Sequence, residues 1–144
     1  MKLVDTNLLL YAIDSASVHH PATKKFLEQA LAAEETLALP WAVITGFIRL
    51  STNRQVTKRP MDPKAACAIV DGWLAFPNVV ALDPGPDHWR ILRELIEATG
   101  AGGNLTNDAH LAAMAIENGA ELYSADSDFA RFPRLKWTDP TRGT

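Results

Sequence analysis

The chain has 144 residues, of which 47% are hydrophobic and 22% are charged; this composition fits one globular domain and excludes a disordered or collagen-like protein. Its formal net charge of -3 argues against a protein that holds nucleic acid by bulk positive charge, although nucleic acid stays open as a substrate. The single cysteine, Cys67, excludes an internal disulfide framework and favours the cytoplasm, and no apolar stretch reaches the length of a membrane span.

The first half of the chain alternates between short apolar runs and stretches with helical periodicity. A strand is predicted at Lys2 to Val4, followed by a helix from Thr6 to Ile13. A second helix carries Pro21 in its first turn. The apolar run from Thr36 to Leu39 predicts a second strand, and Pro40 opens a third helix.

The second half continues this alternation. Asp62 is a good N-cap for a fourth helix, in which Cys67 is expected to belong to the core. A buried strand is predicted at Asn78 to Leu82, then a helix, and then a late helix with Thr106 as its N-cap. The last predicted strand covers Glu121 to Ser124. Strands and helices alternate throughout, which predicts an α/β fold with a mainly parallel sheet covered on both faces.

Four of the ten aspartates differ from the rest in their position relative to the predicted strands. Asp5 ends the first strand, and Asp126 and Asp128 follow the last one. Asp108 lies one turn into the late helix. Because ligands of open α/β sheets bind beyond the carboxyl ends of the strands, we expect these carboxylates to meet in one crevice.

Carboxylates that share a crevice repel one another unless a cation is present. Mg²⁺ or Mn²⁺ is predicted, because hard oxygen ligands suit these ions and the chain has no cysteine–histidine cluster that would prefer zinc. Taken singly, a residue such as Asp108 is more often a helix-dipole residue, and residues such as Asp126 and Asp128 are more often turn residues. The predicted metal site therefore depends on their combination.

Three segments carry a resemblance to a known family. The stretches DTNLLLY, TNDAHLAAMA and LYSADSDFARF resemble the three acidic blocks of PIN-domain nucleases, and LPWAVITGFIRLSTN resembles part of one subgroup of bacterial VapC toxins. The resemblance implies a single PIN domain over residues 1–140, followed by a tail at 141–144. It also implies an α/β/α sandwich around a parallel sheet, and a Mg²⁺-dependent ribonuclease that serves as the toxin of a toxin–antitoxin pair.

The same resemblance implies roles for individual residues. Asp5, Asp108 and Asp126 match the metal-binding acids of the family, and Asp128 falls where many relatives carry an acid. Gly46 stands where many PIN domains have a glutamate, so either Asp128 or water replaces that ligand or one metal alone is held well. The implied reaction is hydrolysis of an RNA phosphodiester by a metal-activated water. The implied partners are a VapB-like antitoxin and a second copy of the chain.

Positive charge is concentrated in one part of the chain, because the segment from Thr36 to Met61 contains no acid. An ordinary solvated surface explains its basic residues as well as an RNA-binding track does. The late helix also contains His110, which we expect to point to a different face from Asp108. The basic residues of the acid-free segment are Arg49, Arg54, Lys58 and Arg59.

Two other function classes stay open at this point. A PIN module that binds RNA or a protein partner without cutting would explain the missing glutamate at Gly46. Phosphoryl-transfer α/β domains, such as haloacid-dehalogenase-like phosphatases and response-regulator receivers, also gather aspartates at strand ends. The first of these expects Asp-x-Asp after the first strand, whereas Asp5 is followed here by Thr6 and Asn7.

Overall fold

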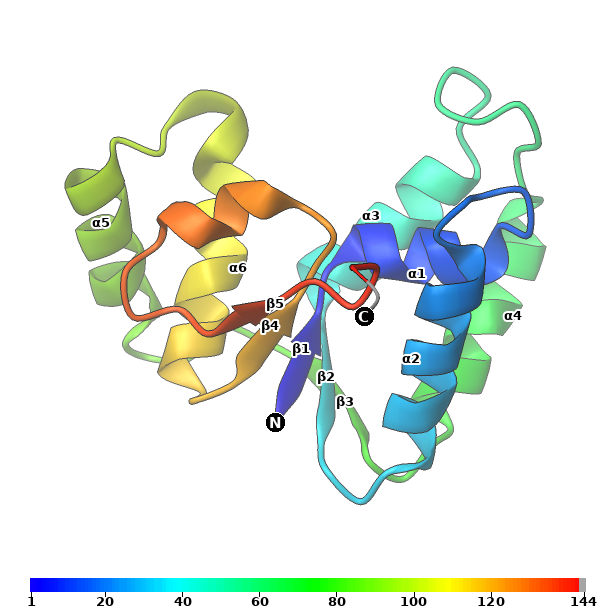
Figure 1. Ribbon diagram of the computed structural model, residues 1–144, viewed down its shortest axis with the longest axis horizontal. Helices are drawn as coiled ribbons and strands as arrows, with labels where there is room; N and C mark the ends of the chain where they lie inside the picture. The colour runs from blue at the N-terminus through cyan, green and yellow to red at the C-terminus, as the bar shows by residue number, and fades with distance from the viewer. Residues whose placement is uncertain (143–144) are drawn as a thin grey trace.

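Five parallel strands form the centre of the molecule, in the order β3-β2-β1-β4-β5 (Figure 1). The computed structural model describes residues 1–142, so the last two residues of the expected C-terminal tail lie outside the described residues. The predicted α/β fold with a parallel sheet is confirmed. The strands are β1 (Lys2–Val4), β2 (Leu37–Pro40), β3 (Val79–Leu82), β4 (Glu121–Tyr123) and β5 (Trp137–Thr138).

Helices cover both faces of this sheet, with α1 to α4 on one side and α5 and α6 on the other (Figure 1). The chain steps from β1 to β2 to β3 in one direction and then returns past them to β4. Right-handed crossovers place the helices of the outward and return paths on opposite faces, which gives the three layers. The helices are α1 (Thr6–Ile13), α2 (His20–Ala32), α3 (Trp41–Ser51), α4 (Pro63–Leu74), α5 (His88–Thr99) and α6 (Thr106–Glu117).

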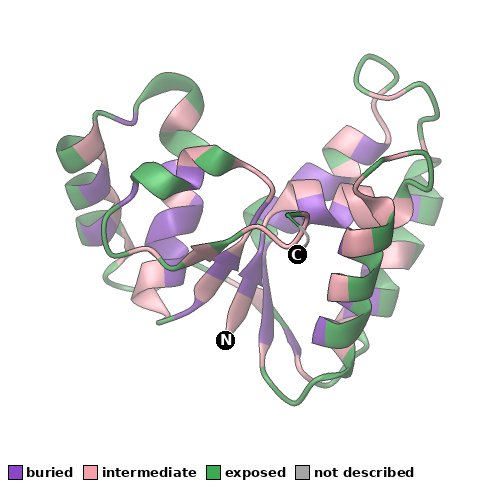
Figure 2. Ribbon diagram, viewed as in Figure 1, coloured by how far each residue is buried: buried purple, intermediate pink, exposed green. Residues whose placement is uncertain are grey.

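The core consists of the central strands and the helix faces turned toward them (Figure 2). Leu3 and Val4 of β1 and Leu122 of β4 are fully buried. On the side of α1 to α4, the Phe47 ring of α3 packs edge-on against Trp73 of α4, with ring centroids 4.9 Å apart. Within residues 1–142, every helix is too short or too polar to cross a membrane.

Several local predictions differ from the structure for physical reasons. Thr106 is the first residue of α6 and not its N-cap, because a 3-10 turn at Gly103–Leu105 leads directly into the helix. The strand β3 lies at the edge of the sheet, so Val80 is exposed and only part of the strand is buried. Cys67 is exposed on α4, whose core face carries Ala66, Val70 and Trp73. The Asp62 cap was predicted correctly: its carboxylate accepts from the Lys64 amide at 3.0 Å.

Candidate functional site

The site lies where neighbouring strands lead into different parts of the fold. β1 and β4 are adjacent and parallel, but β1 continues into α1 on one face of the sheet whereas β4 is reached from α6 on the other. Such a switch in topology opens a crevice beyond the carboxyl ends of the two strands. Asp5 follows β1 there, and its amide donates to Tyr123 O of β4 at 3.0 Å. Asp126 follows β4 at the same edge.

A buried hydrogen-bond network fixes the Asp5 carboxylate. Its Oδ1 accepts from the Thr6 amide at 2.7 Å, which caps α1, and its Oδ2 accepts from Ser124 Oγ at 2.8 Å. Asn7 Nδ2 donates to Asp5 Oδ2 at 3.3 Å and to Ser124 Oγ at 3.1 Å, while Asn7 Oδ1 accepts from the Ala125 amide. Asn7 and the fully buried Ser124 thus tie the ends of β1 and β4 together. The sequence motifs contained both residues, but neither was predicted to position Asp5.

Three of the four predicted carboxylates come close together. Ligand oxygens of Asp108, Asp126 and Asp128 all lie within 4.8 Å of one another. Asp108 projects from the first turn of α6, and the other two lie at the start of the 3-10 helix η2 (Ser127–Arg131), where Asp126 Oδ1 accepts from the Asp128 amide at 2.9 Å. Asp128 Oδ1 is paired with the Arg131 guanidinium at 3.1 Å. Asp5 stands outside this group of three, although it borders the same cleft.

The four aspartates influence one another electrostatically. Burial, followed by the negative charges of Asp126, Asp5 and Asp128, raises the pKa of Asp108 from 3.8 to about 6, against a smaller opposing effect of Arg131. Burial also raises the pKa of Asp5, and the hydrogen bond from Ser124 and the Thr6 amide oppose this shift. The site therefore holds more negative charge than its surroundings neutralise, which is the condition under which a cation binds.

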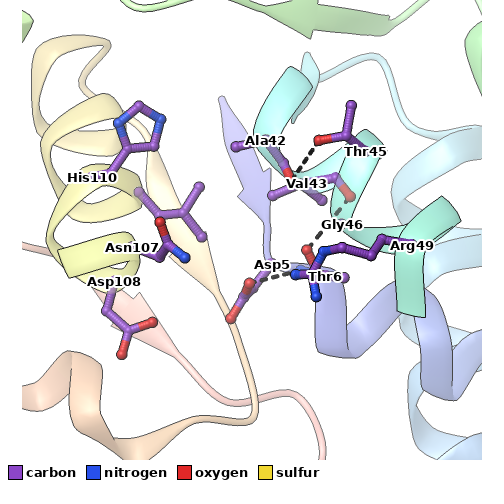
Figure 3. Close-up of a pocket in the computed structure, with 11 residues that line it drawn as sticks. Asp5, Thr6, Ala42, Val43, Thr45, Gly46, Arg49, Asn107, Asp108 and His110 are labelled. Carbon is purple, nitrogen blue, oxygen red and sulfur yellow. Dashed lines mark hydrogen bonds between the residues drawn. The ribbon is translucent and has the colours of Figure 1, made fainter. Parts of the chain in front are cut away.

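A cleft of about 370 Å³ is lined by Asp5 and Asp108. Figure 3 shows Asp108 and His110 on its α6 side, Thr45 and Arg49 on its α3 side, and Asp5 between them. Although Asp108 and His110 lie two residues apart on α6 and point in different directions (Figure 3), both line this one cleft.

Gly46 also lines the cleft, on its α3 wall. A Cβ atom at this position would lie 3.0 Å from Thr6 Oγ1, which is closer than ordinary van der Waals contact. The α3 wall therefore brings a backbone close to Thr6 and supplies no carboxylate. Of the predicted acids, Asp5 after β1 and Asp108 of α6 line this cleft, and the α3 side contributes the cation Arg49 instead.

The predicted basic residues do not share one location. Arg49 lines the cleft of the aspartates, and it forms no ion pair within residues 1–142. Arg59 lines a separate groove between the end of α1 and the segment after α3, together with Tyr11 and Met61. Arg54 and Lys58 are exposed on the segment that joins α3 to α4.

A pair of histidines was not foreseen from the sequence. His88, the first residue of α5, lies with its Nε2 atom 2.9 Å from Nδ1 of His110 on α6. The two rings meet edge to face, with centroids 4.6 Å apart. Burial lowers the pKa of His88 and the pKa of His110, and His88 lowers the latter further. No spacing in the sequence signals this pair, because the residues belong to different helices.

A protein family and several known proteins match this chain over nearly its whole length. The family described as PIN domain matches residues 2–135. Ribonuclease VapC37 of Mycobacterium tuberculosis is 41% identical over 140 residues, which cover 97% of each chain. VapC ribonuclease Mb2897 of Mycobacterium bovis is 44% identical over 143 residues, covering 99% of this chain and 97% of that protein.

Solved structures show the same fold. VapBC2 from Rickettsia felis, bound to a DNA fragment from its promoter, aligns with a TM-score of 0.69 at 22% identity and covers 96% of this chain and 97% of the other. Mycobacterium tuberculosis VapC20, described as a toxin that cleaves the sarcin–ricin loop, aligns with a TM-score of 0.65 at 18% identity, covering 94% and 99%. From the family match and the full-length relatives, the chain belongs to the PIN-domain family and, within it, to the VapC group.

Proposed function

We propose that this chain is the toxin of a type II toxin–antitoxin pair, an endoribonuclease that hydrolyses RNA phosphodiester bonds with Mg²⁺ in the cytoplasm. The observation that carries the proposal is the set of aspartates at the β1–β4 switch point, of which Asp5 and Asp108 line a cleft that also holds Arg49. The relatives of similar length are named ribonucleases, which supports the same activity here. Residues 1–140 would form its single PIN domain.

The donor set fits a hard divalent cation. Carboxylate oxygens are the ligands that Mg²⁺ and Mn²⁺ favour, and binding a cation would relieve the repulsion that raises the Asp108 pKa. Asp5, Asp108 and Asp126 match the metal-binding acids of the family, and we assign the metal to them. Asp128, whose ligand oxygen lies within 4.8 Å of those of Asp108 and Asp126, is the adjoining fourth acid of the catalytic site, and its carboxylate is paired with Arg131.

Each part of the site has its own task in this reaction. A bound Mg²⁺ supplies an activated water and stabilises negative charge on the phosphoryl oxygens. The Asn7–Ser124 network holds the Asp5 carboxylate in one orientation, so that little reorganisation is needed when a ligand binds. Arg49 on the opposite wall donates to the RNA backbone and offsets the repulsion between phosphates and the acids.

Two partners belong to this proposal. A VapB-like antitoxin would cover the toxin until it is needed, and a second copy of the chain would form a homodimer. Solved structures of similar fold include VapBC complexes from Rickettsia felis and nontypeable Haemophilus influenzae, which supports an antitoxin as a partner.

The decisive experiment is a cleavage assay with the purified chain and total bacterial RNA. We expect new RNA ends at defined sites with Mg²⁺, none with EDTA, and recovery when Mg²⁺ or Mn²⁺ is returned in excess. Mapping the new ends identifies the RNA. If the protein binds neither ion and cuts no RNA, the proposal is wrong, and the binding module suggested by Gly46 takes its place.

The Ser124→Ala substitution tests the network behind Asp5. The hydroxyl donates to Asp5 and accepts from Asn7 and from the Asp126 amide, so its removal takes one partner from each of three partly buried polar groups. We expect cleavage to fall about tenfold and the free energy of unfolding to fall by about 1–3 kcal/mol. Initial rates and urea denaturation measure the two effects.

Ser124→Thr, which keeps the hydroxyl, and Ser127→Ala at an exposed neighbouring position are the matched controls. We expect both to cleave at rates close to that of wild type. Equal rates for Ser124→Ala and wild type would show that the hydroxyl does not position Asp5.

A further inference from the structure

The His88–His110 pair connects the α5–α6 layer to the wall of the cleft. His110 lines the cleft beside Asp108, and its Nδ1 atom is occupied by His88 Nε2 at 2.9 Å. Its Nε2 atom has no hydrogen-bond partner within residues 1–142. His88 Nδ1 is buried and likewise has no partner there. Of the four ring nitrogens of the pair, two are joined by a hydrogen bond and two have no partner within residues 1–142, and this limits which nitrogens can carry the protons.

The buried Nδ1 of His88 decides the arrangement. At pH 8, above the ordinary histidine pKa of about 6.5, each ring carries one proton. If His110 Nδ1 were the donor, His88 would have to carry its proton on Nδ1, and a buried N–H would be left without an acceptor. Buried N–H groups are rarely left so, whereas an unpaired lone pair is better tolerated. His88 Nε2–H therefore donates to His110 Nδ1, and the proton of His110 resides on Nε2.

The position of His88 is itself held from α6. Glu117, at the last turn of that helix, accepts from the Gly85 amide through Oε1 and from the Asp87 amide through Oε2, both at 2.9 Å. These bonds fix the segment that leads into α5 directly before His88. A Cβ atom at Gly85 would meet the Glu117 carboxylate, so a larger residue there would displace the end of this side chain. α6 thus carries His110 itself and, through Glu117, also holds the segment that precedes His88.

We propose that His110 is a substrate-binding residue whose Nε2–H donates to a backbone oxygen of the RNA, a phosphate or a 2′-hydroxyl, beside the cleaved bond, and that His88 is the positioning residue that fixes this tautomer. The inference rests on the proposed ribonuclease function. A neutral N–H donor suits this place, because it binds an RNA oxygen without forming an ion pair with the nearby Asp108 carboxylate.

Kinetics with three substitutions of His110 test the substrate contact at pH 8, on an RNA oligonucleotide that carries the mapped cleavage site. The glutamine side chain places an amide near the position of Nε2, whereas asparagine reaches only as far as Nδ1. We expect His110→Gln to keep KM within about twofold of wild type, and His110→Asn and His110→Phe to raise it about threefold to tenfold with kcat little changed. Unchanged KM in the phenylalanine variant would overturn the proposal.

The 2′-deoxy form of the same oligonucleotide, substituted at the nucleotides beside the cleaved bond, separates the two acceptors. If the 2′-hydroxyl is the partner, wild type loses the same factor in KM on the deoxy substrate and His110→Phe loses nothing further. If a phosphate is the partner, the effect of His110→Phe is the same on both substrates. If the glutamine, asparagine and phenylalanine variants of His110 all changed KM by the same factor on both substrates, a direct contact would be contradicted.

The role of His88 has a spectroscopic test that needs no activity. In ¹⁵N-histidine NMR spectra at pH 8, we expect both His88 and His110 as Nε2–H tautomers, with loss of the fixed His110 tautomer in His88→Phe and recovery in His88→Gln. KM should follow the same order, and His19→Gln, on another helix start, is the control. An Nδ1–H tautomer at His110 would refute the inference even if wild type cleaves RNA; failure of wild type to cleave would refute the proposed function and with it the RNA contact, while the fixed tautomer is judged by the spectra.

Discussion

Asp108→Asn is expected to reduce RNA cleavage by about 10³-fold or more while making the metal-free protein more stable. The substitution removes one carboxylate from the proposed metal ligands but keeps the size of the side chain. A bound metal contributes several kcal/mol of charge stabilisation in the transition state, and each 1.36 kcal/mol corresponds to a factor of ten in rate. Loss of activity together with a gain in stability is expected for a charged group that is needed for the reaction but destabilises the folded state.

The sign of the stability change follows from the Asp108 pKa, which lies at about 6 in the folded protein against 3.8 as the ordinary value. The folded state holds this proton more tightly than the unfolded chain does, so the charged carboxylate opposes folding above pH 6. The penalty shrinks as the pH falls through 6 and is absent below about 3.8. Because Asp108 is only half-buried, solvent screening limits the gain on substitution to about 1 kcal/mol.

The measurement is thermal unfolding in EDTA at pH 8 and at pH 4, beside the cleavage assay in Mg²⁺. We expect Asp108→Asn to unfold about 3 °C above wild type at pH 8 and close to it at pH 4. Mg²⁺ should raise the unfolding temperature of wild type and have little effect on the variant. Asp71→Asn, at an exposed position on α4, is the control for both assays. Full Mg²⁺-dependent activity in Asp108→Asn would contradict the proposed site.

Much of the fold follows from local patterns in the sequence. The apolar run that stops at Asp5 placed the first strand at its observed bounds, and the Asp62 cap placed the start of the fourth helix. The two-residue strand β5 was not predicted, because its pairing depends on β4 and not on its own composition. The exposure of β3 follows from its place at the sheet edge, which only the strand order reveals.

The candidate site, too, could be predicted from the sequence only in part. The aspartates were predictable because strand ends of a parallel sheet meet at one edge, whatever the details of packing. The histidine pair and the anchor at Glu117 were not, because their contacts join residues 22 and 32 positions apart on separate elements. Arg49 could be distinguished from Arg54 and Lys58 only once α3 was seen to form a wall of the cleft.

Arg49→Gln is expected to raise KM for RNA by about 10- to 100-fold with a smaller effect on kcat. Arg49 lines the cleft opposite Asp108 and forms no ion pair within residues 1–142, so its charge is available to a phosphate. A hydrogen bond to a charged group is worth about 1.5–3 kcal/mol, which is a factor of roughly 10 to 100. Removing one phosphate contact should also reduce the slope of log affinity against log salt by about one.

Arg54→Gln provides the comparison, since it removes the same charge from the same acid-free segment at an exposed position outside the cleft. We expect this variant to change KM by less than about twofold, because exposed charges beyond a Debye length, about 8 Å at physiological salt, are screened from the bound strand. Binding of the inactive Asp108→Asn protein to RNA, measured at several salt concentrations, separates the two arginines without cleavage. Equal effects of the two substitutions would show that the whole segment, and not the cleft wall, attracts RNA.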